Sequence, residues 1–205
     1  MRDAVIVSTA RTPIGRAYRG AFNATPSPTL AAHAIRAAVE RAGIDPASID
    51  DVVFGSALQQ GVQAMIGRTA ALRAGLPHTV SGMSIDRQCA SGLMTIATAA
   101  KQVIVDRMDA VVAGGVESIS LVQTQAVRMD PDPELLAMVP DMYMPMLQTA
   151  EVVAKRYGID RDRQDAYSFQ SQQRTAAAQS RGAFDDEIVP VTTTMNVVDK
   201  ETKAV

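Results

Sequence analysis

The sequence is poor in cysteine, histidine, long apolar runs and unbalanced charge, and each shortage excludes a class of protein. One cysteine excludes a disulfide within the chain, and two histidines leave no Cys/His cluster for zinc. A net charge of -2 argues against a nucleic-acid surface, which would carry excess lysine and arginine. No apolar stretch reaches the roughly 20 residues of a membrane span, and the N-terminal one is too short for a signal peptide. We therefore expect a soluble protein of a reducing compartment, the cytoplasm.

The residues that are present fit a layered α/β protein. Apolar residues make up 47% of the 205 residues, which allows a sizeable core in one large domain or in one domain and a smaller piece. Short apolar runs predict strands over residues 4–10, 51–58, 79–85 and 109–113, the first of them buried. Helical patterns over 30–42, 65–74 and 89–107 lie between them. Strands that alternate with helices predict a parallel sheet covered by helices.

The pattern changes after Glu117. Residues 123–147 contain four prolines and five methionines. Helices resume over 149–157 and 162–180, with Asp160 as the expected N-cap of the second helix, and a strand-like tail follows over 187–194. We therefore expect two domains, a layered unit over residues 1–120 and an incomplete second unit over 121–205.

Cys89 is the only cysteine, and it lies where a predicted strand meets a predicted helix. A thiol at the first turn of a helix faces unpaired backbone N–H groups and the positive end of the helix dipole. Both favour the thiolate, which is the nucleophilic form. A buried structural cysteine is the alternative. The helix after Cys89 is apolar on most faces and is expected to be buried, so the residues alone leave both interpretations open.

Four segments, in order, resemble the motifs of the thiolases, the acetyl-CoA acyltransferases. The segment Ser84-Ile85-Asp86-Arg87-Gln88-Cys89-Ala90-Ser91-Gly92-Leu93 resembles their nucleophile motif. The other segments resemble their N-terminal motif, the glycine pair that closes their first domain and the start of their loop domain: Arg11-Thr12-Pro13-Ile14-Gly15, Ala113-Gly114-Gly115-Val116-Glu117-Ser118, and Thr149-Ala150-Glu151 with the residues around Gln164 and Gly182. The resemblance covers essentially the whole chain. It implies a thiolase-like α/β fold, with the N-terminal αβα nucleophile half over 1–120 and part of the substrate- and CoA-binding loop domain over 121–205.

The resemblance also implies a reaction. In thiolases the nucleophilic cysteine is acylated during thiolytic cleavage of a 3-oxoacyl-CoA or during Claisen condensation of acetyl-CoA. Cys89 matches that position, and its backbone N–H would stabilise an oxyanion. Acyl-CoA and CoA are then substrates, and no covalently bound cofactor is expected. A homo-oligomer is also expected, because thiolases are typically dimers or tetramers.

Other parts of a thiolase active site are absent from this chain. The family carries a catalytic histidine, an asparagine and a second cysteine in a C-terminal half. His33 and His78 do not fit the missing role, because His33 lies on a polar helix face and His78 follows Pro77 at a strand start. We therefore expect the chain alone to be inactive. Its partner is the C-terminal thiolase half, encoded by the same gene or by a separate chain.

The methionine-rich stretch offers one candidate substrate-binding residue. Met146 matches a methionine at the acyl pocket of acetoacetyl-type thiolases. Pro145 stands where those enzymes have histidine, and Gln148 also departs from their pattern, which leaves room for a longer or bulkier acyl group. Packing within the loop or against a second copy is the alternative role for Met146.

Two other functions remain open at this point. A ketoacyl-synthase relative also carries a cysteine at a helix start in a similar layered fold, and a preference for acyl carrier protein over CoA would distinguish it. A non-catalytic assembly subunit would bind a partner chain or acyl-CoA without turnover. The reactivity of Cys89 toward acyl-CoA separates that function from an enzyme half.

Overall fold

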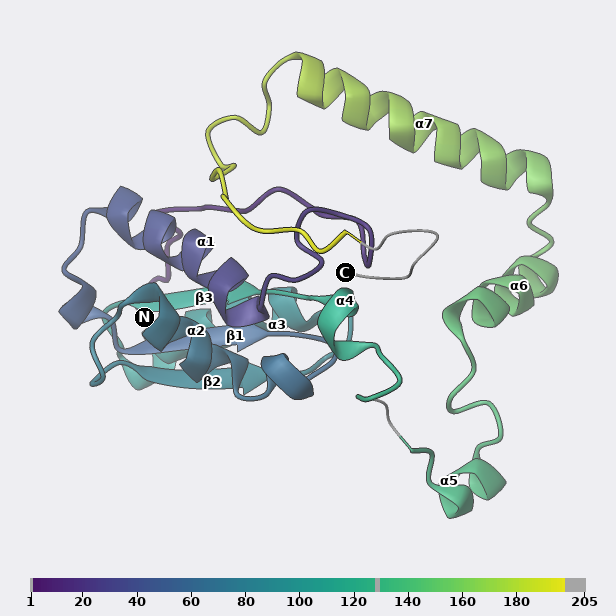
Figure 1. Cartoon of the computed structure of the whole chain (residues 1–205), viewed down its shortest axis with the longest axis horizontal. Coiled ribbons are helices and arrows are strands. Elements are labelled where there is room, and N and C mark those ends of the chain that lie inside the picture. Colours follow the sequence, from purple (N-terminus) through teal and green to yellow (C-terminus); the bar gives the residue numbers. More distant parts are fainter. Residues whose placement is uncertain (1, 128–129, 198–205) are drawn as a thin grey trace. The chain divides into compact units, whose positions relative to one another are not determined.

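The structure is a computed structural model that describes residues 2–127 and 130–197 (Figure 1). Its contacts divide the chain into two compact units. The first contains Met1–Arg128 together with Glu187–Val205, and the second contains Met129–Asp186. The described residues 187–197 therefore belong to the first unit, although the second unit precedes them in the sequence. The domain boundary expected near residue 120 stays a prediction.

A three-stranded sheet forms the centre of the first unit. Its strands are β1 (Asp51–Gly55), β2 (Ser81–Ile85) and β3 (Val111–Gly115), in the order β2-β1-β3. Both pairings are parallel, and Gly55 lies opposite Ile85 on one side and Gly115 on the other. The predicted parallel α/β sheet is therefore confirmed.

Helices cover both faces of this sheet. The longer ones are α1 (Ser27–Ala42), α2 (Ile66–Ala74) and α3 (Ser91–Lys101), and α3 continues into a π-helical turn, η3 (Gln102–Asp106). Shorter turns are η1 (Pro46–Ser48), η2 (Gly61–Gln63) and α4 (Ile119–Val122). The crossover through α2 leads from β1 to β2, and the crossover through α3 leads in the opposite direction, from β2 past β1 to β3. Because parallel crossovers are right-handed, α2 and α3 therefore lie on opposite faces of the sheet. The unit is thus a helix–sheet–helix sandwich (Figure 1).

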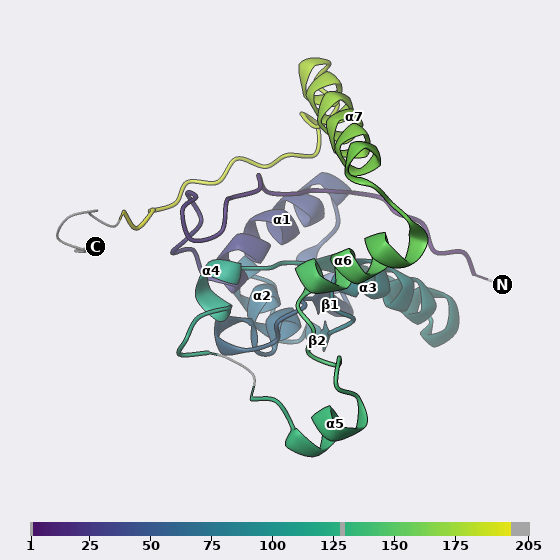
Figure 2. The same cartoon turned by 90° about the vertical axis from the view of Figure 1, so that its right-hand side faces the viewer.

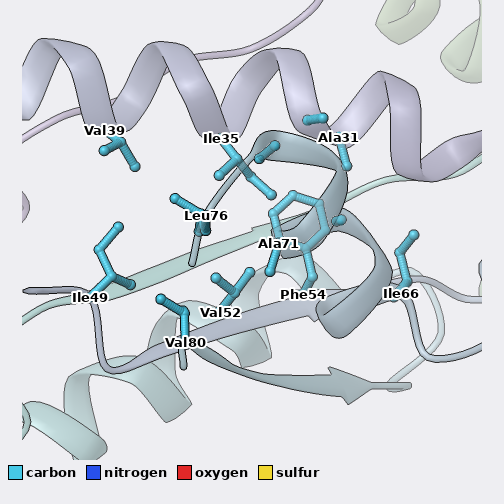
Figure 3. Close-up of a cluster of buried hydrophobic side chains, with 13 residues drawn as sticks. Ala31, Ile35, Val39, Ile49, Val52, Phe54, Ile66, Ala71, Leu76 and Val80 are labelled. Carbon is cyan, nitrogen blue, oxygen red and sulfur yellow. The ribbon is translucent and has the colours of Figure 1, made fainter. Parts of the chain in front are cut away.

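The largest apolar core lies between the sheet and the α1/α2 layer. Ala31, Ile35 and Val39 follow one another at four-residue spacing and are buried along one side of α1. Val52 and Phe54 point toward them from β1 (Figure 3). Buried Val53, between these two, is outside this cluster, as the alternation of a strand requires. The core therefore fixes β1, the strand on which both neighbours pair.

The predicted buried strand over residues 4–10 is wrong. This segment is extended but pairs with no strand of the described residues, and Val5, Ile6 and Val7 are exposed. Hydrogen bonds hold its end: the Arg41 guanidinium donates to the Thr9 carbonyl oxygen at 2.8 Å. At Arg11, which follows, the N–H donates to the Glu187 carbonyl oxygen and the carbonyl oxygen accepts from the Val189 N–H, both at 2.8 Å. The tail expected to be a strand over 187–194 makes only this single bridge beside the N-terminal segment (Figure 2). An apolar run becomes a strand only where a neighbour accepts its hydrogen bonds.

Three helices make up the second unit: α5 (Pro133–Met138), α6 (Met146–Tyr157) and α7 (Arg161–Ser180). Asp160 caps α7 as expected, since its Oδ1 accepts a hydrogen bond from the Arg163 N–H at 2.8 Å. None of the described residues of this unit is buried. Across the described part of the chain, no helix is both long and apolar enough to cross a membrane.

Candidate active site

The carboxyl ends of the three parallel strands bring three segments to one edge of the sheet. Since Gly55 is in register with Ile85 and Gly115, the residues that follow each strand start at the same level. These segments are 56–60, 86–90 and 116–118. In open parallel sheets this edge is where ligands bind. Cys89 belongs to the second of these segments, residues 86–90, and is exposed.

A tight turn between β2 and α3 carries Cys89. Gln88 has φ +50°, a left-handed conformation that a residue with a side chain seldom adopts. Its N–H donates to Asp86 Oδ1 at 2.8 Å, and the Ala90 N–H donates to the Arg87 carbonyl oxygen at 3.1 Å. Sharp strand-to-helix turns of this kind present a side chain away from the sheet. The predicted helix start at Cys89 is wrong by two residues, because α3 begins at Ser91 and Cys89 lies on the preceding turn.

Glycines at the strand ends let the first turn of α3 approach the sheet closely. A Cβ atom on Gly55 would lie 2.8 Å from the Ser91 Cβ, and one on Gly115 would lie 3.6 Å from the Gly92 Cα. The Thr95 hydroxyl completes this contact by donating to the Gly114 carbonyl oxygen at 3.0 Å. The close approach therefore depends on glycines of the strands. A Cβ on Gly92 itself would meet none of the described atoms within 4 Å.

A buried glutamine ties together the segments that follow β1 and β3. Gln63 is 0% exposed, and its side-chain oxygen accepts from the Ser27 hydroxyl at 2.8 Å and from the Ser118 N–H at 2.6 Å. Its side-chain nitrogen donates to the Leu58 carbonyl oxygen at 2.6 Å and to Glu117 Oε1 at 2.5 Å. All four hydrogen-bonding positions of the amide are used. The sequence does not predict this role of Gln63, because a single glutamine near Gly61 carries no signal of burial.

Glu117 links this network to a pocket at the same edge of the sheet. Its Oε2 accepts from the Ala57 N–H at 2.7 Å, and its other oxygen contacts Gln63. The pocket, of about 250 Å³, lies between residues 12–17 and 115–120. Glu117 is therefore held by structural hydrogen bonds, and so is Arg11, which pairs with Glu187 Oε1 at 2.9 Å. No group of three or more acidic, histidine or cysteine side chains that could hold a metal occurs among the described residues.

Comparison with known proteins decides the family. The sequence profile described as "Thiolase, N-terminal domain" matches residues 4–204, which is nearly the whole chain. The chain belongs to the thiolase family. A crystal structure of the Bacillus anthracis acetyl-CoA acetyltransferase superposes with a TM-score of 0.81 at 34% sequence identity, and covers 96% of this chain. The thiolase-like fold inferred from the motifs is confirmed.

Curated relatives in the thiolase family are about twice as long as this chain. The 3-ketoacyl-CoA thiolase of Bacillus subtilis is 39% identical over 204 residues, which are 99% of this chain and 52% of the relative. The acetyl-CoA acetyltransferase of Cupriavidus necator is 39% identical over 203 residues, 93% of this chain and 51% of that protein. The chain thus spans about half the length of the thiolases it matches.

The two histidines of this thiolase chain lie on α1 and in the turn before β2. His78 is exposed in the turn before β2, whereas Cys89 follows β2, so the length of a five-residue strand, roughly 16 Å, separates them. His33 lies on α1. Partial burial lowers its pKa, and the neighbouring charges of Arg36 and Arg73 lower it further. That His33 and His78 do not act as the base for Cys89 stays a prediction.

Met146, the candidate substrate-binding residue, is the first residue of α6 in the second unit and is 73% exposed. Its role stays a prediction.

The helix after Cys89 is less buried than expected. Of α3 only Ser91, Thr95 and Ala99 are buried, while Leu93 is 73% exposed and Ile96 is also exposed. α3 packs on the sheet with one side, and its other side presents apolar residues that the described residues leave uncovered.

Proposed function

We propose that this chain supplies the acyl-accepting part of a thiolase-type acyl-CoA acyltransferase, with Cys89 as the nucleophile. The observation that carries the proposal is the position of the lone cysteine, exposed on a tight turn at the carboxyl edge of a parallel sheet. Two relatives are named as a 3-ketoacyl-CoA thiolase and an acetyl-CoA acetyltransferase. Acyl-CoA and CoA are therefore the proposed substrates, and no bound cofactor is needed.

In the degradative direction, the Cys89 thiolate attacks the C3 carbonyl carbon of a 3-oxoacyl-CoA. The electron pair of that carbonyl moves onto its oxygen, and the Cys89 backbone N–H would donate a hydrogen bond to this oxyanion. As the carbonyl re-forms, the C2–C3 bond breaks and C2 takes up a proton, which releases acetyl-CoA. The sulfur of a second CoA then attacks the acyl-cysteine, gives the shortened acyl-CoA and returns the Cys89 thiolate. Claisen condensation is the reverse sequence.

Proton transfer at C2 needs an acid and a base, and we propose that neither comes from this chain. His33 and His78 are its only histidines, and His78 lies at the opposite end of β2 from Cys89. We therefore propose that a C-terminal thiolase half completes the site. The exposed apolar side of α3, with Leu93 and Ile96, supports a covering partner. Met146 would contribute to the acyl pocket, and the complete protein would be a cytoplasmic homo-oligomer.

Exchange of labelled CoA tests the proposed nucleophile without needing the carbon–carbon step. In this assay the chain is mixed with acetyl-CoA and isotopically labelled CoA, and the label passes into acetyl-CoA through acetyl-Cys89. We expect exchange with the parent chain. With Cys89→Ser we expect only the uncatalysed rate, because a serine hydroxyl is a weaker nucleophile than a thiolate and an acetyl-serine ester would transfer its acetyl group to CoA far more slowly than an acetyl-cysteine thioester. An equal rate for both chains, at the level of buffer alone, would favour a non-catalytic assembly subunit.

Thiolysis of acetoacetyl-CoA tests the need for a second half. We expect the purified chain to show no turnover with acetoacetyl-CoA and CoA, because we assign the groups that move the proton at C2 to the C-terminal half. Rapid thiolysis by the chain alone would contradict this part of the proposal.

A further inference from the structure

The hydroxyl of Ser91 spans the turn that carries Cys89. Ser91 is the first residue of α3 and is 4% exposed. Its Oγ donates to the Gln88 carbonyl oxygen at 2.6 Å and accepts from the Arg87 N–H at 2.9 Å. Both partners are backbone groups of the two residues immediately before Cys89. One buried side chain therefore closes the turn from both sides.

This double contact has a specific task, because the turn contains a backbone conformation that does not form readily. Gln88 has φ +50°, in the left-handed region that glycine adopts at no steric cost and other residues seldom occupy. The direction in which the Cys89 side chain leaves the backbone depends on that angle, since Gln88 is the preceding residue. The Ser91 hydroxyl and the Ser91 N–H, which also donates to the Gln88 carbonyl oxygen at 3.0 Å, hold that carbonyl in place.

The end of β1 holds Ser91 on the side away from the turn. A Cβ on Gly55 would lie 2.8 Å from the Ser91 Cβ, so the end of β1 lies directly against this side chain. The hydroxyl is thus fixed between a rigid strand and the turn, with its donor and one acceptor position both in use. Through these contacts, Ser91 fixes the turn that carries Cys89 relative to β1.

We propose that Ser91 is a positioning residue, whose hydroxyl holds Gln88 in its left-handed conformation and so aims the Cys89 thiol at the acyl carbonyl. The role rests on the proposed function of Cys89 and adds a residue that acts through the nucleophile turn. The step it supports is thiol–thioester exchange, in which Cys89 Sγ bonds to the acyl carbon and CoA leaves as the thiolate that takes a proton.

Two reactions of the single cysteine distinguish the orientation of its thiol from its accessibility to a reagent. Iodoacetamide is small and approaches an exposed thiolate from many directions, whereas transfer from acetyl-CoA needs one orientation of the thiol. In Ser91→Ala we expect acetylation of Cys89 by acetyl-CoA to fall by about tenfold or more, and alkylation by iodoacetamide to stay within about twofold. The pH profile of alkylation should be unchanged. A merely structural role for Ser91 would alter both reactions together.

Thr95→Val is the matched control, because it removes a second buried hydroxyl from α3 that touches Gly92 and Gly114 but not the turn. We expect it to keep the parental ratio of acetylation to alkylation. Gln88→Gly in the Ser91→Ala background should recover most of the acetylation rate, since glycine adopts the left-handed conformation without the clamp.

The outcomes distinguish the two proposals. If the parent chain takes up no acetyl group while it is alkylated normally, the proposed function is overturned, and the positioning role with it. If the parent is acetylated and Ser91→Ala matches it, only the positioning role is overturned. A loss in Ser91→Ala that Gln88→Gly fails to recover would also contradict control through Gln88. Amide hydrogen exchange of β1 in each variant verifies that the sheet is folded.

Discussion

Both compact units of this chain contain long helices, yet among the described residues only the first unit has buried side chains. In the first, α1 places Ile35 against Val52 and Phe54 of β1, and the sheet positions the turn with Cys89. In the second, α7 is longer than α1 but none of its residues is buried. Its start is fixed by the Asp160 cap. Local signals are therefore enough to define a helix in this chain, while the candidate site depends on packing.

The largest effect should come from removing the same amount of side chain from a helix of each unit. Ile35→Ala removes a side chain that is 1% exposed and should lower the free energy of unfolding of the first unit by about 2–5 kcal/mol. Leu147→Ala, at a residue that is 84% exposed, should change it by less than about 0.5 kcal/mol. Hydrogen exchange of the β1 amides measures both. Equal losses would contradict the difference between the units.

Two glutamines sharpen the same comparison for polar groups. Gln63→Ala leaves the buried Ser27 hydroxyl and Ser118 N–H without the amide oxygen that accepts their hydrogen bonds. The free energy of unfolding of the first unit, measured by exchange of the β1 amides, should fall by about 1–3 kcal/mol. Gln164 donates to the Ile159 carbonyl oxygen at 3.1 Å on the exposed start of α7. Gln164→Ala should be nearly neutral. A neutral Gln63→Ala would show that the buried network does not fix the segments around the site.

The cap of α7 tests whether local signals hold the second unit. Asp160→Ala removes the acceptor of the Arg163 N–H and should weaken α7 by about 1 kcal/mol. Amide exchange should become faster in the first turns of α7 and stay unchanged in β1. A matching change in β1 would indicate that the two units unfold together.

The smallest effect concerns His33 on α1. Because burial and the charges of Arg36 and Arg73 lower its pKa, the folded state binds a proton less readily than the unfolded chain. The contribution of His33 to stability is therefore fully present above the unfolded pKa of about 6.5 and is lost as pH falls through that value toward the lower folded pKa. NMR titration should give a His33 midpoint below the ordinary histidine value of about 6.5. A midpoint above it would contradict the assigned cause.

Much of the fold is readable from local sequence patterns. The predicted helix over 162–180 appears as Arg161–Ser180, and that over 65–74 as Ile66–Ala74. Gly43, in the left-handed conformation, ends α1 where a glycine after an amphipathic run predicts the end. These outcomes depend on caps, glycines and periodicity, which lie within a few residues of each element.

The remaining features depend on residues far apart in the sequence. Residues 4–10 have the composition of a buried strand, but Val5 and Val7 are exposed because no described strand pairs with them. The burial of Gln63 depends on Glu117 and Ser27, which only the fold brings together. For Cys89 the sequence located the turn between strand and helix. The Ser91 contacts and the left-handed Gln88 became visible only in the structure.

Mass spectrometry of the chain after incubation with excess acetyl-CoA tests the central claim most directly. Because Cys89 is the only cysteine, a thioester can form at one place alone. The account predicts an acetyl group that maps to the peptide containing Cys89, is released by hydroxylamine, and is absent in Cys89→Ser. An unmodified chain, or an acetyl group that persists in Cys89→Ser on lysine, would contradict it.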